Sequence, residues 1–217
     1  MQLLACYGFP VLPTELAKDA EQAAALADTI GYPVALKIYS PQIIHKSDAG
    51  GVQINLQSAQ AVKDAFAQIT ANAVAFDPQA HILGVLVQKM AAKGLEVILG
   101  ATRYPKFGHL LMFGSGGVSV EVFKDVAFRL APINRNSARL MVRGIKGYAL
   151  LDGFRGQPKA DVLALEKCLV RLSNLVMDLP EIKELDINPL VVFPQEQGAV
   201  AADCRFILDG GDESFSK

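Results

Sequence analysis

The sequence predicts a two-lobed fold of the α+β (α/β) class. Its 217 residues are 51% hydrophobic and only 20% charged, so the chain can bury a substantial core. Segments with the period of a helix alternate with short apolar segments typical of strands. No internal repeat or low-complexity linker interrupts this alternation. We expect one lobe over 1–78, a second over 79–208, and a polar tail or linker at 209–217.

The first lobe is predicted from two capped helices and two strands. Asp19 is a suitable N-cap for an alanine-rich helix that runs to Ile30, and Gly31 is placed to end it. Ser58 is the N-cap of a second helix. Its apolar face comprises Ala61, Val62, Ala65, Phe66 and Ile69. The strands are predicted at 33–39 and at 51–56, the latter with apolar alternation at Val52, Ile54 and Leu56.

The second lobe is predicted to contain more strands than helices. Residues 82–90 and 95–102 are rich in strand-forming residues, and the gap at 91–94 is short enough to join neighbouring strands. Further strands are expected at 108–113, 126–131, 183–193 and 199–208. Helices are expected at 134–151 and at 159–178, where Pro180 stops the second one.

Charge, hydropathy and cysteine content exclude several classes of protein. The formal net charge of −1 is unlike that of a nucleic-acid binder, and no apolar run is long enough for a membrane helix. The widely separated Cys6, Cys168 and Cys204 do not suggest a disulfide framework or a zinc cluster. We expect a cytoplasmic protein with no nucleic-acid or membrane partner.

Lys37 and the loop that follows it are the first candidate site. Lys37 interrupts an apolar strand, where a cation needs an anionic partner such as a phosphate or a route to water at a sheet edge. The following polar loop contains His45 and the pair Gly50 and Gly51. These glycines can bring backbone N–H groups close to a phosphate, or simply reverse the chain. His45 can carry a proton or a phosphoryl group, or cap a turn.

Two further segments carry candidate ligands. One strand ends at Gln88, Lys89 and Met90, where its backbone groups can form hydrogen bonds with an adenine edge. Nearby, the Glu96 carboxylate can accept hydrogen bonds from ribose hydroxyls. The alternative for this segment is an ordinary hairpin with solvated charges.

In the other segment, Asp186 and Asn188 share a strand face, and an antiparallel neighbour places Asp203 beside Asn188. Such oxygen ligands suit Mg²⁺, although a strand with a polar face looks the same in sequence.

Taken together, these segments resemble the ATP-grasp domain of NDP-forming (ADP-forming) acyl-CoA synthetases, relatives of the succinyl-CoA synthetase β chain. The resemblance runs in one order from about Leu4 to Leu208. It rests on 33–38, 45–52, 87–90 with 96–100, Gly114–Gly117 with Glu121 and Asp125, and 184–190. The same domain is found in bacterial protein lysine acetyltransferases.

The resemblance implies a role for each candidate residue and a nucleotide bound between the two lobes. Lys37, Gly50 and Gly51 are then assigned to the phosphates of ATP or ADP, and residues 88–90 to an adenine hinge. Glu96 is assigned to ribose, and Asn188 with Asp203 to Mg²⁺. His45 corresponds to the histidine that passes a phosphoryl group between an acyl phosphate and the nucleotide. Gly114–Gly117 would help to form the wall where the phosphohistidine loop docks.

The resemblance also implies a partner. Such a synthetase needs a CoA-binding ligase domain, in the same chain or another, and no Gly-rich Rossmann unit is found here. The alternative is a regulatory or structural nucleotide-binding module followed by a C-terminal acetyltransferase module.

Overall fold

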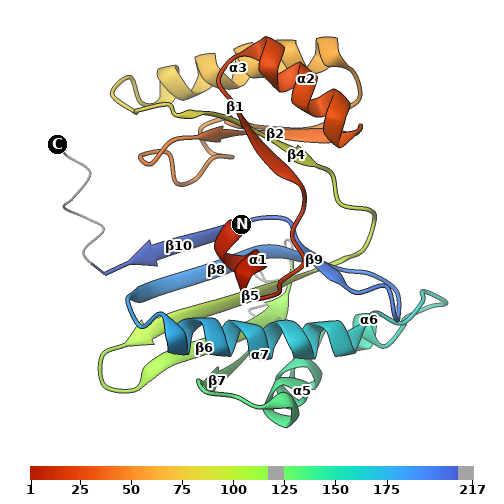
Figure 1. Ribbon diagram of the computed structural model, residues 1–217. Helices are drawn as coiled ribbons and strands as arrows, with labels where there is room; N and C mark the ends of the chain where they lie inside the picture. Colours follow the sequence, from red (N-terminus) through yellow and green to blue (C-terminus); the bar gives the residue numbers. More distant parts are fainter. Residues whose placement is uncertain (117–124, 210–217) are drawn as a thin grey trace. The chain divides into compact units, whose positions relative to one another are not determined.

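The computed structural model describes residues 1–116 and 125–209, which form two compact units (Figure 1). The small unit is Leu12–Met90, and the large unit combines Met1–Val11 with the chain from Ala91 onward. The division follows sheet membership: β4 (Gly84–Lys89) pairs with strands of the small unit, so that unit extends to Met90 rather than to residue 78. Residues 210–217 of the predicted tail lie outside the described residues.

The small unit is an antiparallel sheet of order β1-β4-β2-β3 with two helices on one face (Figure 1). The helices confirm the predicted caps: Asp19 Oδ1 accepts from the N–H of Gln22 at 2.8 Å, and Ser58 Oγ from that of Ala61 at 3.2 Å. The remaining elements are β1 (Thr14–Ala17), α2 (Ala20–Ile30), β2 (Val34–Tyr39), β3 (Val52–Leu56) and α3 (Ala59–Phe76).

Strand alternation gives the small sheet a packed face and an uncovered one. Leu36 and Ile38 of β2, with Val85 and Val87 of β4, are fully buried in the same core as α2 and α3. The alternation predicted for β3 is wrong at Ile54, which is 63% exposed. The next residue, Asn55, has a positive φ of 60°, so β3 is irregular before Leu56 returns to the core.

The large unit is an antiparallel sheet of order β10-β8-β5-β6-β7, with β9 paired to β8 (Figure 1). Its strands are β5 (Leu95–Tyr104), β6 (Gly108–Ser115), β7 (Val126–Leu130), β8 (Ile182–Val192), β9 (Ala199–Ala201) and β10 (Cys204–Leu208). Its helices are α1 (Gln2–Cys6), α5 (Arg135–Gly144), α6 (Tyr148–Leu151) and α7 (Val162–Asp178). Leu99, Leu111, Leu185 and Ile187 pack in one core with α5 and α7.

Three predictions for the large unit are corrected by the structure. β4 and β5 are not neighbours: β4 pairs with β1 and β2, whereas β5 pairs with β6 and β8. The helix predicted at 134–151 ends at Gly144, and a second helix begins at Tyr148. The strand predicted at 199–208 is divided into β9 and β10. Within the described residues, no helix is both long and apolar enough to cross a membrane.

Candidate functional site

Lys37 lies on the uncovered face of the small sheet. Its neighbours Leu36 and Ile38 point into the core, so alternation directs Lys37 to the other face, where it is half-buried. It is aligned with Val52 of β3 and Leu86 of β4. A central strand therefore presents this cation to the face that α2 and α3 leave open, as the phosphate hypothesis requires.

The loop that carries His45 is closed by its own backbone. His45 is exposed, and its carbonyl oxygen accepts from the N–H of Ala49 at 3.4 Å. The N–H groups of Gly50 and Gly51 donate to the carbonyl oxygens of Ser47 and Lys46, at 3.0 and 2.8 Å. Both amides are thus used inside the loop, so a phosphate contact from either one requires the loop to open.

Both glycines are also required by the local geometry. Gly50 has a φ of +58°, and a Cβ there would lie 2.8 Å from Asn72 Nδ2. A Cβ on Gly51 would lie 2.5 Å from Ile38 Cγ2. The loop therefore packs directly against the end of the Lys37 strand, which fixes where it leaves the sheet.

The segment 88–90 is tied into the small sheet by backbone and side chain. Lys89 N–H donates to the Pro13 carbonyl at 3.0 Å, and Met90 N–H to that of Pro33 at 3.1 Å. Gln88 is buried, and its Nε2 donates to Thr14 Oγ1 at 2.9 Å. The two amides expected to read an adenine edge are therefore already bonded within the unit.

The Lys89 side chain has a structural role. Its Nζ donates to the carbonyl oxygens of Gly31 at 2.7 Å and Tyr32 at 2.9 Å, just after α2 ends. These bonds anchor the end of β4 to the α2–β2 connection. Any nucleotide contact at this position would have to come from the backbone rather than from the ammonium group.

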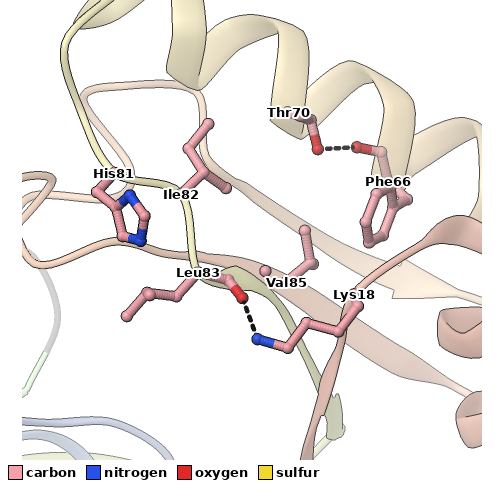
Figure 2. A pocket seen from close by; sticks show the side chains of 8 residues that line it. Lys18, Phe66, Thr70, His81, Ile82, Leu83 and Val85 are labelled. Atoms are coloured by element: carbon pink, nitrogen blue, oxygen red, sulfur yellow. Dashed lines mark hydrogen bonds between the residues drawn. The ribbon is translucent and has the colours of Figure 1, made fainter.

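A cavity of about 290 Å³ in the small unit lies apart from these residues. Lys18 is among the residues that line it, and its Nζ donates to the Leu83 carbonyl at 2.8 Å (Figure 2). Thr70 Oγ1 donates to the Phe66 carbonyl at 2.8 Å. Phe66 and Thr70 belong to α3, so the cavity is on the helix side of the sheet, away from Lys37.

Glu96 lies near the start of β5 in the large unit. Its side chain is exposed, and its carbonyl oxygen accepts from the N–H of Gly116 at 2.8 Å. A Cβ on Gly116 would lie 2.5 Å from the Glu96 backbone, so only glycine allows this approach. The predicted ribose ligand and the described part of the glycine cluster are therefore in direct contact, whereas Gly117 and Glu121 lie outside the described residues.

Asn188 and Asp203 are adjacent, as the sequence predicts. The N–H of Asn188 donates to the Asp203 carbonyl at 3.2 Å, between the pairings of β8 with β9 and with β10. Their side chains supply amide and carboxylate oxygens, a donor set that fits Mg²⁺ when phosphate oxygens and water complete the coordination. No group of three or more His, Cys, Asp or Glu side chains arranged to hold a metal is found over residues 1–116 and 125–209.

Next to this pair, the uncovered face of the large sheet is hollowed into a cavity of about 290 Å³. Arg205, Asp186, Gly100, Met112 and Phe128 form one row across five strands and line it. Gly100 contributes no side chain, and the end of the Met112 side chain lies over it, 3.2 Å from where a Cβ would be.

Asp186 occupies an acidic part of that row. Burial raises the pKa of its carboxyl group; the Arg205 guanidinium opposes this, and the nearby carboxylates of Asp203 and Glu184 raise the pKa further. A cation bound near Asp203 would relieve this concentration of negative charge.

Sequence reasoning gave no role to the most fully hydrogen-bonded carboxylate near the glycine cluster. Asp125 is buried, and it accepts from Ser115 Oγ at 2.8 Å, from the Lys146 N–H at 2.6 Å and from the Gly147 N–H at 2.7 Å. The only sequence signal was its place after the glycine cluster, because two of its partners are backbone amides far along the chain.

The predicted residues are distributed over both units. The small unit holds Lys37, His45, Gly50, Gly51 and residues 88–90, and the large unit holds Glu96, Asn188 and Asp203. Within the units, the structure brings together Lys37 with the His45 loop, Glu96 with Gly116, and Asn188 with Asp203.

Comparison with known proteins gives concordant matches over almost the whole chain. A family model described as an ATP-grasp domain matches residues 1–208. The chain is 47% identical over 210 residues to the beta subunit of acetate–CoA ligase [ADP-forming] II of Pyrococcus furiosus, covering 96% of this chain and 89% of that protein. It is also 47% identical to the 4-hydroxybutyrate–CoA ligase [ADP-forming] of Nitrosopumilus maritimus, of which it spans 30%.

Solved structures with the same fold also match almost the whole chain. A Pyrococcus horikoshii protein superposes with a TM-score of 0.92 at 47% identity, covering 95% of this chain and 88% of that one. The dinucleotide-forming acetyl-coenzyme A synthetase 1 of Ca. Korarchaeum cryptofilum, in complex with coenzyme A, Ca-AMPCP and HgCl+, gives a TM-score of 0.92 at 43% identity, covering 95% and 90%.

Proposed function

This chain belongs to the ATP-grasp family, and from that premise we propose that it is the nucleotide-binding part of an ADP-forming acid–CoA ligase. The observation that carries the proposal is the 47% identity with a ligase beta subunit over 96% of this chain and 89% of that protein. The reaction is the interconversion of acyl-CoA, ADP and phosphate with acid, CoA and ATP. Acetate is the first acid to test, because it is named in that relative.

The nucleotide is assigned to residues of both units. Lys37 neutralises phosphate charge from the uncovered face of the small sheet, and Glu96 accepts hydrogen bonds from ribose hydroxyls. The backbone of 88–90 borders the adenine, and the Gly50–Gly51 turn approaches the phosphates when the loop opens. Phosphoryl transfer depends mainly on positioning and on charge neutralisation, which a lysine and backbone amides provide.

Asn188 and Asp203 are the proposed Mg²⁺ ligands. When bound, Mg²⁺ would neutralise phosphate charge and orient the phosphoryl group. The two residues supply too few oxygens for a dedicated metal site, so we expect binding together with the nucleotide. A relative at 41% identity was solved with coenzyme A and Mg-AMPPCP, which supports this pairing of ligands.

His45 is the proposed phosphoryl carrier. An imidazole nitrogen attacks the phosphorus of an acyl phosphate. An N–P bond forms, the P–O bond to the acyl group breaks, and the acid leaves as its carboxylate. A terminal oxygen of ADP then attacks that phosphorus, the N–P bond breaks, and ATP and free imidazole result. Exposure of His45 on a polar loop supports this role, and so does the phosphohistidine segment named for the Korarchaeum enzyme.

The ligase needs a CoA-binding partner domain, in the same chain or in another one. The chain spans about 30% of single-chain ligases such as that of Archaeoglobus fulgidus, which leaves room there for such a domain. The Pyrococcus furiosus and Nitrosopumilus maritimus relatives are ligases, so this function is preferred to a regulatory module ahead of an acetyltransferase. We propose that the ligase acts in the cytoplasm, where cysteines such as Cys6, Cys168 and Cys204 are kept as thiols.

The test is acyl-CoA-dependent ATP synthesis by the ligase reconstituted with its CoA-binding partner. His45→Ala should abolish synthesis while the chain still binds Mg-ADP. His81→Ala is the matched control, because His81 is also an exposed loop histidine of the small unit. Undiminished synthesis by His45→Ala would refute the relay. A wild-type ligase with nucleotide binding but no synthesis would favour the regulatory module.

A further inference from the structure

Asp125 joins two parts of the large unit that are separate in sequence. One carboxylate oxygen, Oδ2, accepts from Ser115 Oγ at 2.8 Å and from the Gly147 N–H at 2.7 Å, and Oδ1 accepts from the Lys146 N–H at 2.6 Å. Asp125 is only 8% exposed, so water cannot readily replace these donors. The carboxylate thus ties the end of β6 to the junction between α5 and α6.

The same contacts explain the local sequence and structure. The N–H groups of Lys146 and Gly147 bond to Asp125 instead of continuing the helix from α5, so the helix is interrupted there. A Cβ on Gly147 would clash with Ser115 Oγ and lie 3.0 Å from Asp125 Oδ2. Glycine is therefore required where the amide approaches the carboxylate most closely.

The end of β6 is held from its other side by the candidate ribose ligand. The N–H of Gly116 donates to Glu96 O at 2.8 Å, and the N–H of Ser115 donates to Asp125 O at 3.3 Å. Ser115 and Gly116 therefore lie between two fixed supports. Both supports are backbone carbonyl groups. The Asp125 carboxylate adds a side-chain contact, through Ser115 Oγ at 2.8 Å, and it can be altered without changing a proposed nucleotide ligand.

We infer that Asp125 is a positioning residue for phosphoryl transfer, which holds Ser115 and Gly116 beside the backbone of Glu96, the proposed ribose ligand. This inference rests on the proposed function. Asp125 acts through backbone placement, so its loss should slow transfer and leave nucleotide affinity unchanged. Small displacements of groups that position reactants are known to reduce rates by about a hundredfold.

Asp125→Asn is the principal variant. An amide has one acceptor oxygen, and its NH₂ group would face one of the N–H donors that the carboxylate now accepts. Ser115→Ala removes one of three donors without creating a repulsive contact, so it should have a smaller effect in the same direction. Asp152→Asn is the matched control, because Asp152 is exposed and its carboxylate forms an ion pair with Lys159 at 2.9 Å.

The experiment uses the reconstituted ligase with labelled Mg-ATP. Single-turnover phosphorylation of the enzyme gives the transfer rate, and calorimetry gives the Mg-ADP dissociation constant. We expect Asp125→Asn to slow transfer between about tenfold and a hundredfold, Ser115→Ala to slow it by less, and both to keep the wild-type dissociation constant.

Each other outcome is informative. Equal transfer rates in wild type and Asp125→Asn would overturn the inference, and so would a parallel loss of Mg-ADP affinity, which indicates a general folding role. If Asp125→Asn does not fold, the test rests on Ser115→Ala, and a transfer rate equal to that of wild type in this variant would refute the inference. A wild-type enzyme that neither binds Mg-ADP nor transfers phosphate would instead refute the proposed function.

Discussion

Asn188 and Asp203 are joined by a backbone hydrogen bond of 3.2 Å, which makes a residue with an amide side chain the neighbour of one with a carboxylate. Asn188 is exposed, and Asp203 is half-buried. The pair lies where β8 changes partners from β9 to β10, and the β5–β8 register also shifts nearby, between Val97 and Leu99. Such irregularities release a strand end from regular pairing and direct polar groups toward a ligand.

The first prediction follows from this pair. Asp203→Ala should weaken Mg-ATP binding and barely change metal-free ADP binding, because a carboxylate is lost from the metal and not from the nucleotide. Calorimetry with and without Mg²⁺ measures both. Asp152→Ala removes a distant exposed carboxylate and should change neither. Equal losses with and without Mg²⁺ would indicate a folding defect and refute the assignment.

A second prediction concerns Lys37 and Glu96, one from each unit. Wild-type protein at about 100 times the dissociation constant of Mg-ADP should gain about 2.7 kcal/mol of unfolding free energy. Lys37→Met keeps the apolar stem of the side chain and removes the charge, so this gain should fall sharply. Glu96→Gln should reduce it less, since the amide still accepts a hydrogen bond. Thermal unfolding with and without Mg-ADP is the measurement, and an unchanged midpoint in folded wild type would contradict both assignments.

Local signals in the sequence predicted most helices and strands, because caps and periodicity act within one segment. The helix from Ala20 to Ile30 begins and ends where Asp19 and Gly31 predict. Strand partners, in contrast, are chosen by contacts between distant segments. Nothing in 91–94 shows that the chain passes there from one sheet to another. β1 was missed because its four residues include only one buried side chain, Ala17.

In the candidate site, too, features that depend on one segment or on simple strand pairing were predictable, and contacts with distant segments were not. The adjacency of Asn188 and Asp203 follows from antiparallel pairing, and Lys37 is recognisable because it is the one charged residue in the strand from Val34 to Tyr39. The uses of Gly50, Gly51 and Lys89 were not predictable, since their partners are carbonyl groups, which every residue carries. The role of Asp125 was not predictable either, because two of its partners are backbone N–H groups far along the chain.

Lys89 gives a third prediction. Its half-buried ammonium group donates to two carbonyl groups, so Lys89→Met should cost about 1–3 kcal/mol of unfolding free energy by leaving them without a donor. Lys18→Met is the control, because Lys18 is exposed and donates to one carbonyl group rather than two. Urea unfolding compares the two variants. If Lys89→Met is as stable as wild type but loses Mg-ADP affinity, the ammonium group is a nucleotide ligand after all.

The final prediction is a pH dependence of stability at Asp125. Burial alone raises the pKa of this carboxyl group, but hydrogen bonds from the Gly147 and Lys146 amides and from Ser115, with the charge of Lys146, outweigh it and lower the pKa below 3.8. A pKa that is lower in the folded state stabilises the protein above the unfolded value, and this contribution is lost as pH falls through the folded value.

The difference in unfolding free energy between wild type and Asp125→Asn should therefore be largest near neutral pH and should decrease below about pH 4, because only wild type has a carboxylate at position 125 to protonate. Urea unfolding at about pH 7, 5 and 3.5 measures this difference, and Asp152→Asn tests whether any carboxyl group gives the same trend. A difference that stays constant, or that grows in acid, would mean that Asp125 is not held as the charged form. Acid should also loosen the junction at Lys146 and Gly147, so the protection of these amides, measured as exchange relative to the intrinsic rate at each pH, should fall over the same range in wild type and not in Asp125→Asn.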